Sequence, residues 1–460
     1  MSRSSFIMAG TQSGVGKTSL TLGLARAFKL RGKEVQTFKV GPDYLDPSHL
    51  SLASGKACYN LDSWMTNSEY VSALYHKKIA SAQIGLVEGV MGLFDGASTD
   101  SLKGSTAEIA LILKRPVILV LDASGMARSF CAMVKGYVEF EKELKIIGVI
   151  ANRVGSLSHG ELLKNALAFD GLPPLLGAVP EGELATLPSR HLGLVDASEL
   201  DSEEEILNTL ATQVEKFLDL DLILNLTKDE QEYPSLSKVI PSKRMVLGVA
   251  RDPAFKFTYA DNLEALEQQG VELQYFSPMK DTKLSSHYDA LYFPGGYPEL
   301  YAKELSSNGP FISSLKDFYQ QGKLIYAECG GLLYFCESLK TDTSEEFPLI
   351  GLVPAKAQMN KRLSRLGYAE ASFLKDNPWG KKGDRLKGHV FHYSSLGEAE
   401  TLENELAPFE ILRRKSKNKE GFLLKNLMAS YVHLHWASRE ESIEHFIQYA
   451  LKCSNEARSL

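Results

Sequence analysis

The chain has 460 residues, and at about 150 residues per domain this length predicts two or three domains, because single hydrophobic cores stop growing near ~250–300 residues. Hydrophobic residues make up 44% and charged residues 23%, values that exclude a disordered, fibrous or membrane-spanning chain. The 51 Lys and Arg residues against 57 Asp and Glu residues give a net charge of -6, which argues against a nucleic-acid binder.

The five cysteines are scattered and lack CxxC spacing, which argues against a disulfide framework and against a zinc site. Four of them are interpreted as small buried side chains: Cys58, Cys131, Cys336 and Cys453. No apolar run reaches the ~18 residues of a membrane span, and Phe6–Gly10 is shorter than the ~7–15 residues of a signal-sequence core. The sequence therefore predicts a cytoplasmic protein that does not associate with a membrane.

From the N-terminus to Leu226, short runs rich in β-branched residues alternate with helix-length amphipathic stretches. This alternation is typical of βαβ units around a parallel sheet. In the first predicted helix, Leu20, Leu24 and Phe28 recur at four-residue spacing, and Gly32 ends it. The expected strands are Phe6–Ala9, Val35–Val40, Ile84–Glu88, Pro116–Asp122, Ile146–Ala151 and Leu175–Val179.

A polar stretch with two prolines, Thr227–Lys243, is expected to be an exposed linker. The sequence thus predicts a first domain over residues 1–226 and a second over residues 244–460. In the second domain the βα alternation resumes. Its expected elements are the strands Met245–Ala250, Val271–Phe276, Ala290–Phe293 and Leu324–Ala327 and the helix Asn262–Gln269.

The segment GTQSGVGKT lies between the first predicted strand and helix, where backbone N–H groups and the helix N-terminus can surround phosphates. Gly14 and Gly16 allow close backbone approach, Lys17 can reach the β- and γ-phosphates, and the Thr18 hydroxyl can bind Mg²⁺. A glycine turn without a ligand is the weaker interpretation, since strand, GKT and helix coincide. The expected ATP-binding residues are Gly10, Thr11, Gln12, Ser13, Gly14, Val15, Gly16, Lys17, Thr18 and Asn152.

Acidic segments follow the second and third predicted strands, at the edge of the sheet where strand ends gather around the phosphates. Glu88 and Asp43 are therefore expected to bind Mg²⁺. Asp46 and Asp95 are equally well explained as turn or helix-capping residues. Asn152 follows a strand and is expected to contact an adenine edge, with a turn residue as the alternative.

In the second domain, KLIYAECGGLL indicates a strand, a sharp turn and a helix start, with Cys329 at the turn. A helix N-terminus lowers the pKa of a thiol, and the N–H of Gly330 can point at an oxyanion. The glycine turn that contains Gly296 offers a second donor. A lone cysteine is usually a buried small hydrophobe, but this context favours a nucleophile.

A thiolate also needs a base. The late segment SYVHLHW alternates like a strand and places His433 and His435 on one face, so His433 is the expected base.

Taken in order, these segments resemble the cobyrinic acid a,c-diamide synthase family over nearly the whole chain. The matching stretches are GTQSGVGKT, KVGPDYLDPSHL, EGVMGLFDG, ARDPAF, FTYADNLEALE, FPGGYPEL, AECGGLLY, GHVFHYS and SYVHLHWAS. The GTxxxVGKT loop also resembles that of dethiobiotin synthetase, whose relatives transfer phosphate to a carboxylate. Gln12 stands where partition-type ATPases carry a lysine. The resemblance implies an α/β fold with an N-terminal P-loop NTPase domain and a C-terminal class I glutamine amidotransferase-like domain.

The resemblance also implies ATP- and Mg²⁺-dependent amidation of two carboxylates of a corrinoid acid, with ammonia from glutamine. In that reading Cys329 attacks glutamine and His433 raises its nucleophilicity. The partners are these small molecules, with neither nucleic acid nor membrane, and a homodimer is left open. The residues implied at the substrate or phosphoryl-transfer site are Asp43, Tyr44, Leu45, Asp46 and Asp95.

Two departures from the family pattern bear on the chemistry. Many amidotransferases of this class carry Glu two residues after the histidine, whereas this chain has His435, so a Cys–His dyad is expected. The family commonly has Glu after the first histidine of GHxFHYS, and here Val390 takes that place. His389 and His392 are equally well explained as packed histidines or as substrate contacts.

The sequence leaves two alternatives to this function open. Within the same class, the substrate can be another tetrapyrrole such as hydrogenobyrinic acid or nickel-sirohydrochlorin. From another class, an ATP-switch scaffold with an inactive second domain is disfavoured by Gln12 and by the intact turn around Cys329.

Overall fold

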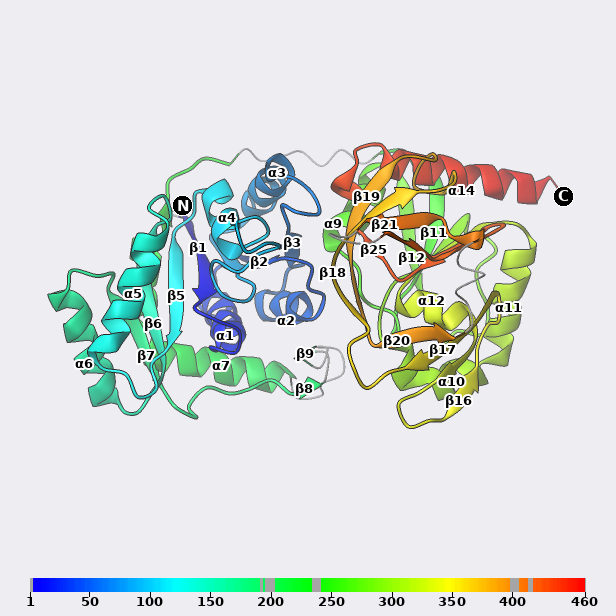
Figure 1. The fold of residues 1–460 in the computed structure, drawn as a ribbon. Helices are drawn as coiled ribbons and strands as arrows, with labels where there is room; N and C mark the ends of the chain where they lie inside the picture. Colours follow the sequence, from blue (N-terminus) through cyan, green and yellow to red (C-terminus); the bar gives the residue numbers. More distant parts are fainter. Residues whose placement is uncertain are drawn as a thin grey trace. The chain divides into compact units, whose positions relative to one another are not determined.

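The computed structural model describes residues 3–190, 193–194, 203–233, 241–397, 405–412 and 417–459 (Figure 1). The chain divides into two compact units, Met1–Ser237 and Lys238–Leu460. Each unit is built around a largely parallel sheet, which confirms the predicted α/β fold of both parts.

The first unit has a parallel sheet with strand order β3-β2-β4-β1-β5-β6-β7. A short strand, β10, pairs antiparallel with the start of β1. Every strand predicted for this part is present, and the three-residue β3 is an addition. The bounds are β1 (Arg3–Gly10), β2 (Val35–Val40), β3 (Tyr59–Leu61), β4 (Ile84–Glu88), β5 (Val117–Asp122), β6 (Ile146–Val154), β7 (Leu175–Pro180) and β10 (Lys228–Asp229), with a separate hairpin of β8 (Ser189–Arg190) and β9 (Gly193–Leu194).

Helices follow the strands in chain order (Figure 1). They are α1 (Lys17–Leu30), α2 (Leu45–Ser54), α3 (Ser68–Ile79), α4 (Thr106–Leu113), α5 (Arg128–Phe140), α6 (Leu157–Phe169), α7 (Glu203–Phe217) and α8 (Leu220–Leu226). Alternate residues of β1, Phe6 and Met8, belong to the core that α1 and α7 cover. Gly23 permits the close approach of these two helices, because a Cβ there would lie 2.8 Å from the Leu210 carbonyl oxygen.

The predicted linker, Thr227–Lys243, begins too early in the sequence, because its first residues belong to the first unit. Residues 228 and 229 form β10, and Arg115 pairs with Asp229 at 2.7 Å. The Arg115 guanidinium also donates to the Tyr233 hydroxyl at 2.5 Å. Residues 228–233 therefore pack on the first unit, because their backbone and side chains have partners there. The remainder of the predicted linker includes residues 234–240, which lie outside the described residues.

We propose that the domain boundary falls between Tyr233 and Met245. Limited proteolysis is expected to cut there first, because each unit has its own core and the intervening sequence is polar with two prolines. Mass spectrometry of the earliest fragments should find two pieces of nearly equal size. Earliest cuts within Val246–Leu333 would contradict this boundary.

The second unit contains a six-stranded sheet in the order β12-β11-β13-β14-β24-β23. The neighbouring strands are parallel except for β23 and β24. The four predicted strands are confirmed, and β14 runs one residue further than expected, to Glu328. The bounds are β11 (Met245–Ala250), β12 (Val271–Phe276), β13 (Ala290–Phe293), β14 (Leu324–Glu328), β23 (Phe422–Leu424) and β24 (Leu427–Ser430). Since β14 and β24 are parallel neighbours, the segments that follow them start at the same edge of the sheet.

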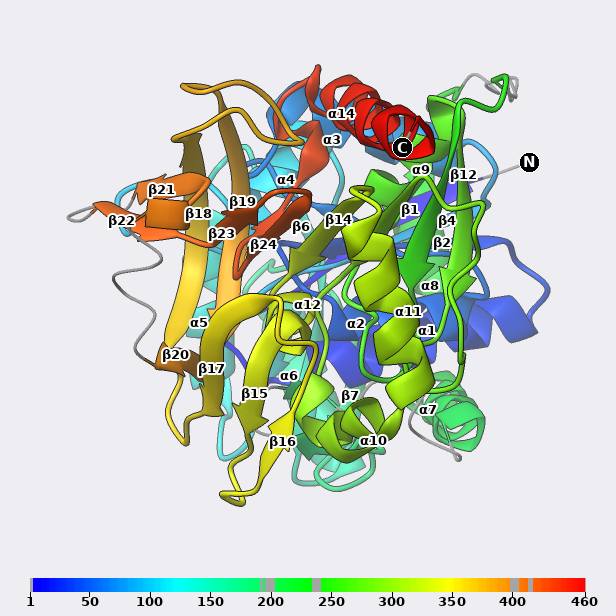
Figure 2. The ribbon, with the colours of Figure 1, turned by 90° about the vertical axis from the view of Figure 1, so that its right-hand side faces the viewer.

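Two smaller sheets of this unit were not predicted from the sequence. Their orders are β16-β15-β17-β20 and β22-β21-β18-β19-β25. In both views the four-stranded sheet lies at the end of the unit away from α14 (Figure 1, Figure 2). The strands are β15 (Cys336–Lys340), β16 (Glu346–Pro348), β17 (Val353–Met359), β18 (Arg365–Phe373), β19 (Arg385–His392), β20 (Ser394–Gly397), β21 (Phe409–Leu412), β22 (Lys417–Glu420) and β25 (His433–Leu434). The helices are α9 (Ala260–Gln268), α10 (Ala302–Ser307), α11 (Gly309–Gln320), α12 (Gly330–Phe335) and α14 (Ser442–Arg458), with 3-10 turns η2 (Pro298–Tyr301) and η3 (Trp436–Ser438).

The pairing of β19 with β25 brings two motifs together. His389 lies opposite His433 in this antiparallel register. Gly388 allows β25 to approach, because a Cβ there would lie 2.0 Å from the His433 carbonyl oxygen. The GHVFHYS and SYVHLHW segments, whose residues His389 and His433 are 44 positions apart, therefore meet through backbone pairing.

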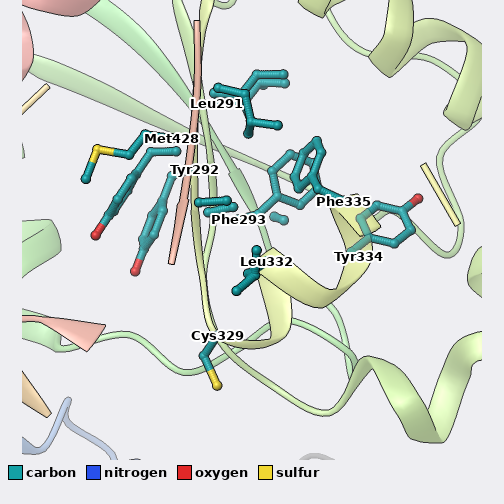
Figure 3. Packing of buried hydrophobic residues seen from close by; sticks show 14 of the residues in the cluster. Leu291, Tyr292, Phe293, Cys329, Leu332, Tyr334, Phe335 and Met428 are labelled. Atoms are coloured by element: carbon teal, nitrogen blue, oxygen red, sulfur yellow. The ribbon is translucent and has the colours of Figure 1, made fainter. Parts of the chain in front are cut away.

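Hydrophobic packing anchors the end of β14. Figure 3 shows Leu291 and Phe293 on one side of β13 and Tyr292 on the other, as strand alternation requires. Phe293 packs edge-to-face on Phe335 of α12, with ring centroids 4.9 Å apart. Cys329 belongs to this cluster, which holds the residue in place while its sulfur points away from the other labelled side chains (Figure 3).

Candidate active sites

The phosphate loop of the first unit connects β1 to α1, as predicted. Gly16 adopts a left-handed conformation with φ 98° and precedes the first residue of α1, Lys17. No side chain caps this end of the helix, so its first N–H groups face the loop. A Cβ at Gly10 would lie 2.6 Å from Val15 Cγ1, so the loop folds tightly on itself. The geometry matches an anion-binding loop at a helix N-terminus.

Lys17 reaches across the loop to the segment after β4. Its Nζ donates to the Met91 carbonyl oxygen at 2.5 Å and to the Gln12 carbonyl oxygen at 3.2 Å. Burial lowers the pKa of Lys17, and the positive charge of Lys39 lowers it further. The two segments EGVMG and GTQSGVGKT therefore meet at this ammonium group.

A buried lysine, Lys39, joins the acids that follow β2 and β4. Its Nζ lies 2.5 Å from Asp46 Oδ2, 3.0 Å from Glu88 Oε1 and 4.0 Å from Asp43 Oδ2. Glu88 is fully buried, and its Oε1 also accepts a hydrogen bond from the Thr18 hydroxyl at 2.6 Å. The structure thus brings the sequence-predicted Asp43, Asp46 and Glu88 together around one cation, and Thr18 joins them through Glu88.

The acids of this cluster differ in how they hold a proton. Burial raises the pKa of Glu88 to about 7 and that of Asp43 to about 6. Burial acts on Asp46 in the same direction, but Lys39 outweighs it and holds the pKa of Asp46 below its usual range. The three carboxylates raise the pKa of Lys39 despite its burial, so its ammonium group stays charged.

Three predicted substrate residues lie at the start of α2. Asp43 Oδ1 accepts hydrogen bonds from the backbone N–H groups of Leu45 at 2.9 Å and Asp46 at 3.1 Å. Tyr44 is half-buried just before the helix. Asp43 is thus a helix-capping residue as well as a neighbour of Lys39, whereas the alternative of a simple cap for Asp46 does not describe its pairing with Lys39.

Asp95 lies apart from the lysine cluster, in the turn after β4. Its Oδ2 accepts from the Gly92 N–H at 2.8 Å, so it stabilises the turn, as one of the two sequence interpretations held. Its carboxylate is close enough to raise the pKa of Tyr137, after burial. The Tyr137 hydroxyl in turn donates to the Thr11 carbonyl oxygen at 2.8 Å, which joins α5 to the phosphate loop.

The residues beside the loop suit Mg²⁺. Thr18 and Glu88 offer oxygen atoms, and Glu88 Oε2 is buried without a hydrogen-bond partner among the described residues. Within the same described parts, no group of three or more His, Cys, Asp or Glu side chains can hold a metal by itself. Mg²⁺ usually takes one or two protein oxygens and completes its shell with phosphate and water.

Asn152 requires a correction. The sequence interpretation assigned it to an adenine edge, but its Nδ2 donates to the Val15 carbonyl oxygen at 2.9 Å and its Oδ1 accepts from the Arg153 N–H at 3.0 Å. The side chain is 5% exposed, and a Cβ on Gly16 would collide with it. Its amide therefore supports the phosphate loop from behind instead of facing a base.

In the second unit, Cys329 occupies the predicted elbow between β14 and α12. Its backbone has φ 48° and ψ -103°, a conformation that non-glycine residues rarely adopt. The backbone N–H of Cys329 donates to the Ser430 carbonyl oxygen at 2.8 Å, which ties the elbow to the end of β24. The strain and this tie fix the direction in which the thiol points.

The sequence predicted a lowered pKa for the Cys329 thiol, and this direction is wrong. Burial raises the pKa of Cys329, and the negative charges of Glu299 and Glu328 raise it further. The N–H of Gly330 acts in the opposite direction but does not outweigh them. α12 has only six residues, so its end offers little dipole. The thiol therefore stays protonated until a base takes its proton.

The two predicted oxyanion donors lie against each other. A Cβ on Gly330 would lie 2.9 Å from the backbone nitrogen of Gly296. Gly296 has φ 157°, and a Cβ there would lie 2.0 Å from the Ala254 carbonyl oxygen. Neither position tolerates a side chain, so both backbones approach the elbow closely.

His433 is buried in β25, which follows β24, the neighbour of the strand that leads to Cys329. Its ring stacks on His389 with centroids 4.9 Å apart, and a Cβ on Gly295 would lie 2.4 Å from its Cε1. Burial lowers the pKa of His433 well below its usual range, and His389 and His392 lower it further. A neutral imidazole is what a general base requires.

The remaining histidines are packed and bonded. His435 Nε2 lies 3.3 Å from Asp261 Oδ2, and the Tyr259 hydroxyl lies 2.8 Å from His389 Nδ1. His392 Nδ1 lies 2.9 Å from the Ser394 carbonyl oxygen. These contacts agree with the interpretation of His389 and His392 as packed histidines.

Sequence reasoning overlooked two residues near these centres. Lys39 is a charged residue in β2, a strand whose residues are all buried. A charge at a buried strand position was the available signal in the sequence. Glu328 directly precedes Cys329, and its carboxylate lies 3.9 Å from His433 Nδ1. No spacing rule connects residues 328 and 433, so only the fold reveals the second pair.

A strained cysteine elbow, with a buried histidine 3.9 Å from the side chain of the preceding residue, is the arrangement expected of a glutamine-hydrolysing enzyme, and the phosphate loop adds a nucleotide-dependent step. Together they define the class of ATP-dependent glutamine amidotransferases. Comparison with known proteins agrees: residues 246–441 match the CobB/CobQ-like glutamine amidotransferase domain, and residues 6–195 match the CobQ/CobB/MinD/ParA nucleotide binding domain.

Full-length relatives narrow the assignment. Cobyrinate a,c-diamide synthase of Syntrophotalea carbinolica is 46% identical, over 98% of this chain and 99% of that protein. The synthase of Leptospira interrogans serovar copenhageni is 42% identical, over 97% and 98%. The chain belongs to the cobyrinate a,c-diamide synthase family. The structure of PurLQS from Thermotoga maritima is similar with a TM-score of 0.33 and 16% identity over 45% of this chain and 98% of that one, which is too low to add to the argument.

The described part of the chain contains no helix that is both long and apolar enough to cross a membrane.

Proposed function

We propose that this enzyme amidates the a and c side-chain carboxylates of cobyrinic acid, with ATP as the phosphoryl donor and glutamine as the source of nitrogen. One observation carries the proposal: a single chain holds both a Lys17 phosphate loop with acidic strand ends and a Cys329 elbow with a buried histidine. The names of the full-length relatives supply the substrate.

Glutamine hydrolysis begins at Cys329. Its sulfur attacks the side-chain carbonyl carbon of glutamine while His433 accepts the thiol proton. The N–H groups of Gly330 and Gly296 donate to the oxyanion. The C–N bond then breaks, His433 returns the proton to the leaving nitrogen, and ammonia departs from a γ-glutamyl thioester. Water hydrolyses this thioester to glutamate.

Amidation takes place around the phosphate loop. A carboxylate has no good leaving group, so the γ-phosphoryl group of ATP is transferred to one of its oxygens to form an acyl phosphate. Lys17 binds the phosphates, and Lys39 holds the acids that face them. Thr18 and Glu88 would hold Mg²⁺, which would supply positive charge against the phosphates. Ammonia attacks the acyl carbon and inorganic phosphate leaves with the transferred oxygen.

Coupling of the two reactions follows from the chemistry of ammonia, which is mostly protonated and unreactive at neutral pH. A fused glutaminase releases the free base from the same chain that consumes it. We place the reaction in the cytoplasm, since the described cysteines are free thiols and Cys329 must remain reduced.

The test of this function is a substrate panel. Cobyrinic acid, hydrogenobyrinic acid and nickel-sirohydrochlorin are each incubated with ATP, Mg²⁺ and glutamine, and the products are read by mass spectrometry. Two successive carboxyl-to-amide shifts on cobyrinic acid are expected. Amidation of nickel-sirohydrochlorin alone would assign a different tetrapyrrole, and glutamine-independent ATP hydrolysis without any amide would support the switch scaffold.

The acids beside the phosphate loop are expected to matter in different ways. Glu88→Gln should raise the Mg²⁺ concentration needed for half-maximal amidation, because the variant loses a charged oxygen ligand. Asp43→Asn and Asp95→Asn should lower the amidation rate about 10- to 100-fold, because each carboxylate is proposed to position the reacting groups.

The measurement is ammonia-dependent amidation across a Mg²⁺ titration. Glu215→Gln is the matched control, since Glu215 pairs with Arg31 on the surface of the same unit. Unchanged rates and unchanged Mg²⁺ dependence in all three variants would mean that these residues serve only in turns and helix caps.

A further inference from the structure

Glu328, the last residue of β14, has both carboxylate oxygens engaged. Its Oε1 accepts the Tyr326 hydroxyl at 2.5 Å and the Leu434 N–H at 3.1 Å. Its Oε2 accepts the Tyr292 hydroxyl at 2.8 Å and lies 3.9 Å from His433 Nδ1. The side chain is 2% exposed. A carboxylate is thus fixed from three sides and directed at the imidazole.

The surrounding donors favour the charged form of this group. Tyr326, Tyr292 and the Leu434 N–H all act to lower the pKa of Glu328, but burial outweighs them and raises it to about 7. The groups that face it are two tyrosines, from β13 and β14, and His433 from β25. The pKa of Glu328 therefore lies near neutral pH.

The His433 imidazole requires a nearby negative charge such as that of Glu328. When His433 takes the thiol proton, a cation forms in a fully buried place, between His389 and the Gly295 backbone. An unpaired buried cation is costly. The residue two positions further on offers no negative charge, because it is His435, which contacts Asp261 instead.

We propose that Glu328 is a positioning residue for glutamine hydrolysis: it holds β25 through the Leu434 N–H and stabilises the His433 imidazolium that forms as Cys329 becomes a thiolate. The inference rests on the proposed glutaminase activity. At 3.9 Å the carboxylate acts on the ring through charge, not through a hydrogen bond. The reacting atoms remain those of Cys329, His433 and glutamine.

The test compares Glu328→Gln, which keeps the shape and removes the charge, with Glu328→Asp, which keeps the charge. Glutaminase kcat should fall about 10- to 100-fold in Glu328→Gln and less in Glu328→Asp, with KM for glutamine changed by less than about threefold. Alkylation of Cys329 by iodoacetamide at neutral pH should slow in parallel, because the lost stabilisation of the His433 imidazolium should outweigh the direct effect of the Glu328 charge, which raises the pKa of the thiol. Ammonia-dependent amidation should be unchanged.

A pH profile separates this role from a purely structural one. In the wild-type enzyme the glutaminase rate should rise through about pH 7 as Glu328 loses its proton. The rise should be absent in Glu328→Gln. In Tyr292→Phe and Tyr326→Phe it should move to higher pH, because these hydroxyls lower the pKa of Glu328. The tyrosine variants keep the inference testable if Glu328→Gln does not fold.

Asp289→Asn is the matched control. Asp289 is another buried carboxylate of this unit, bonded to Ser454 and Arg458 and located before β13, at the opposite edge of the sheet from Cys329. Its loss should lower the melting temperature without changing the pH profile. A Glu328→Gln enzyme with wild-type kcat, alkylation rate and pH profile would overturn the inference. Full glutaminase activity in Cys329→Ala would instead overturn the proposed function itself.

Discussion

Cys329→Ala and Cys329→Ser are expected to lose glutamine-dependent amidation by several orders of magnitude and to keep amidation driven by high ammonium concentrations. Removal of the sulfur abolishes the γ-glutamyl thioester, but external ammonia can still attack an acyl phosphate formed at the phosphate loop. The two rates are measured side by side on the same substrate, with ATP binding as a check on the first unit.

The histidines refine this expectation. His433→Ala should behave like the cysteine variants, because burial raises the pKa of the thiol and leaves it protonated without a base. His435→Ala should be milder, since its contact is with Asp261. A Cys329→Ala enzyme that still uses glutamine would contradict the account, as would a folded one that binds ATP but has lost ammonia-dependent amidation.

Lys17→Ala is expected to abolish amidation with either nitrogen source while leaving basal glutaminase activity measurable. The ammonium group of Lys17 lies where the phosphate loop meets the segment after β4, so its loss removes the contact to the phosphates and not the thiol chemistry of the other unit.

The readouts are amide formation by mass spectrometry and glutamate release in the same samples. Lys29→Ala, on the exposed end of the same helix, is the matched control and should retain both activities. Near-normal ammonia-dependent amidation in Lys17→Ala would refute the assignment of the phosphate loop.

The central parallel strands of both units, such as β1, β4 and β11, could be predicted because nearly all of their residues are buried. A strand such as β11, in which each of the residues Met245–Ala250 is buried, appears in the sequence as a continuous apolar run between turn signals. The same context identified the loop before Lys17 and the elbow at Cys329, since glycines and a strand-to-helix transition mark both positions.

The two smaller sheets escaped prediction because their strands are only partly buried. In β18, Arg365–Phe373, the first four residues are not buried and only alternate residues thereafter are, so no apolar run marks the strand. One of these sheets nevertheless contributes to the candidate site, because β19 pairs with β25 and places His389 opposite His433.

The ion pairs and pKa shifts of both sites could not be predicted from the sequence without the fold. Lys39 gathers three acids from two different strand ends, and Glu328 meets a histidine more than a hundred residues away. The pKa of Cys329 was predicted to be low from its helix end alone, whereas the buried surroundings and nearby carboxylates raise it. Desolvation and long-range charge pairs depend on packing, which a single sequence does not display.

The central claim is that one chain activates a carboxylate with ATP and delivers to it the nitrogen of glutamine. It is tested most directly by incubating the enzyme with cobyrinic acid labelled with ¹⁸O in its carboxylates, ATP, Mg²⁺ and amide-¹⁵N glutamine. The account predicts ¹⁵N in both new amides and one ¹⁸O in inorganic phosphate for each amide formed. Amide formation without ¹⁸O in phosphate would contradict the acyl phosphate, and product without ¹⁵N would contradict the role of Cys329.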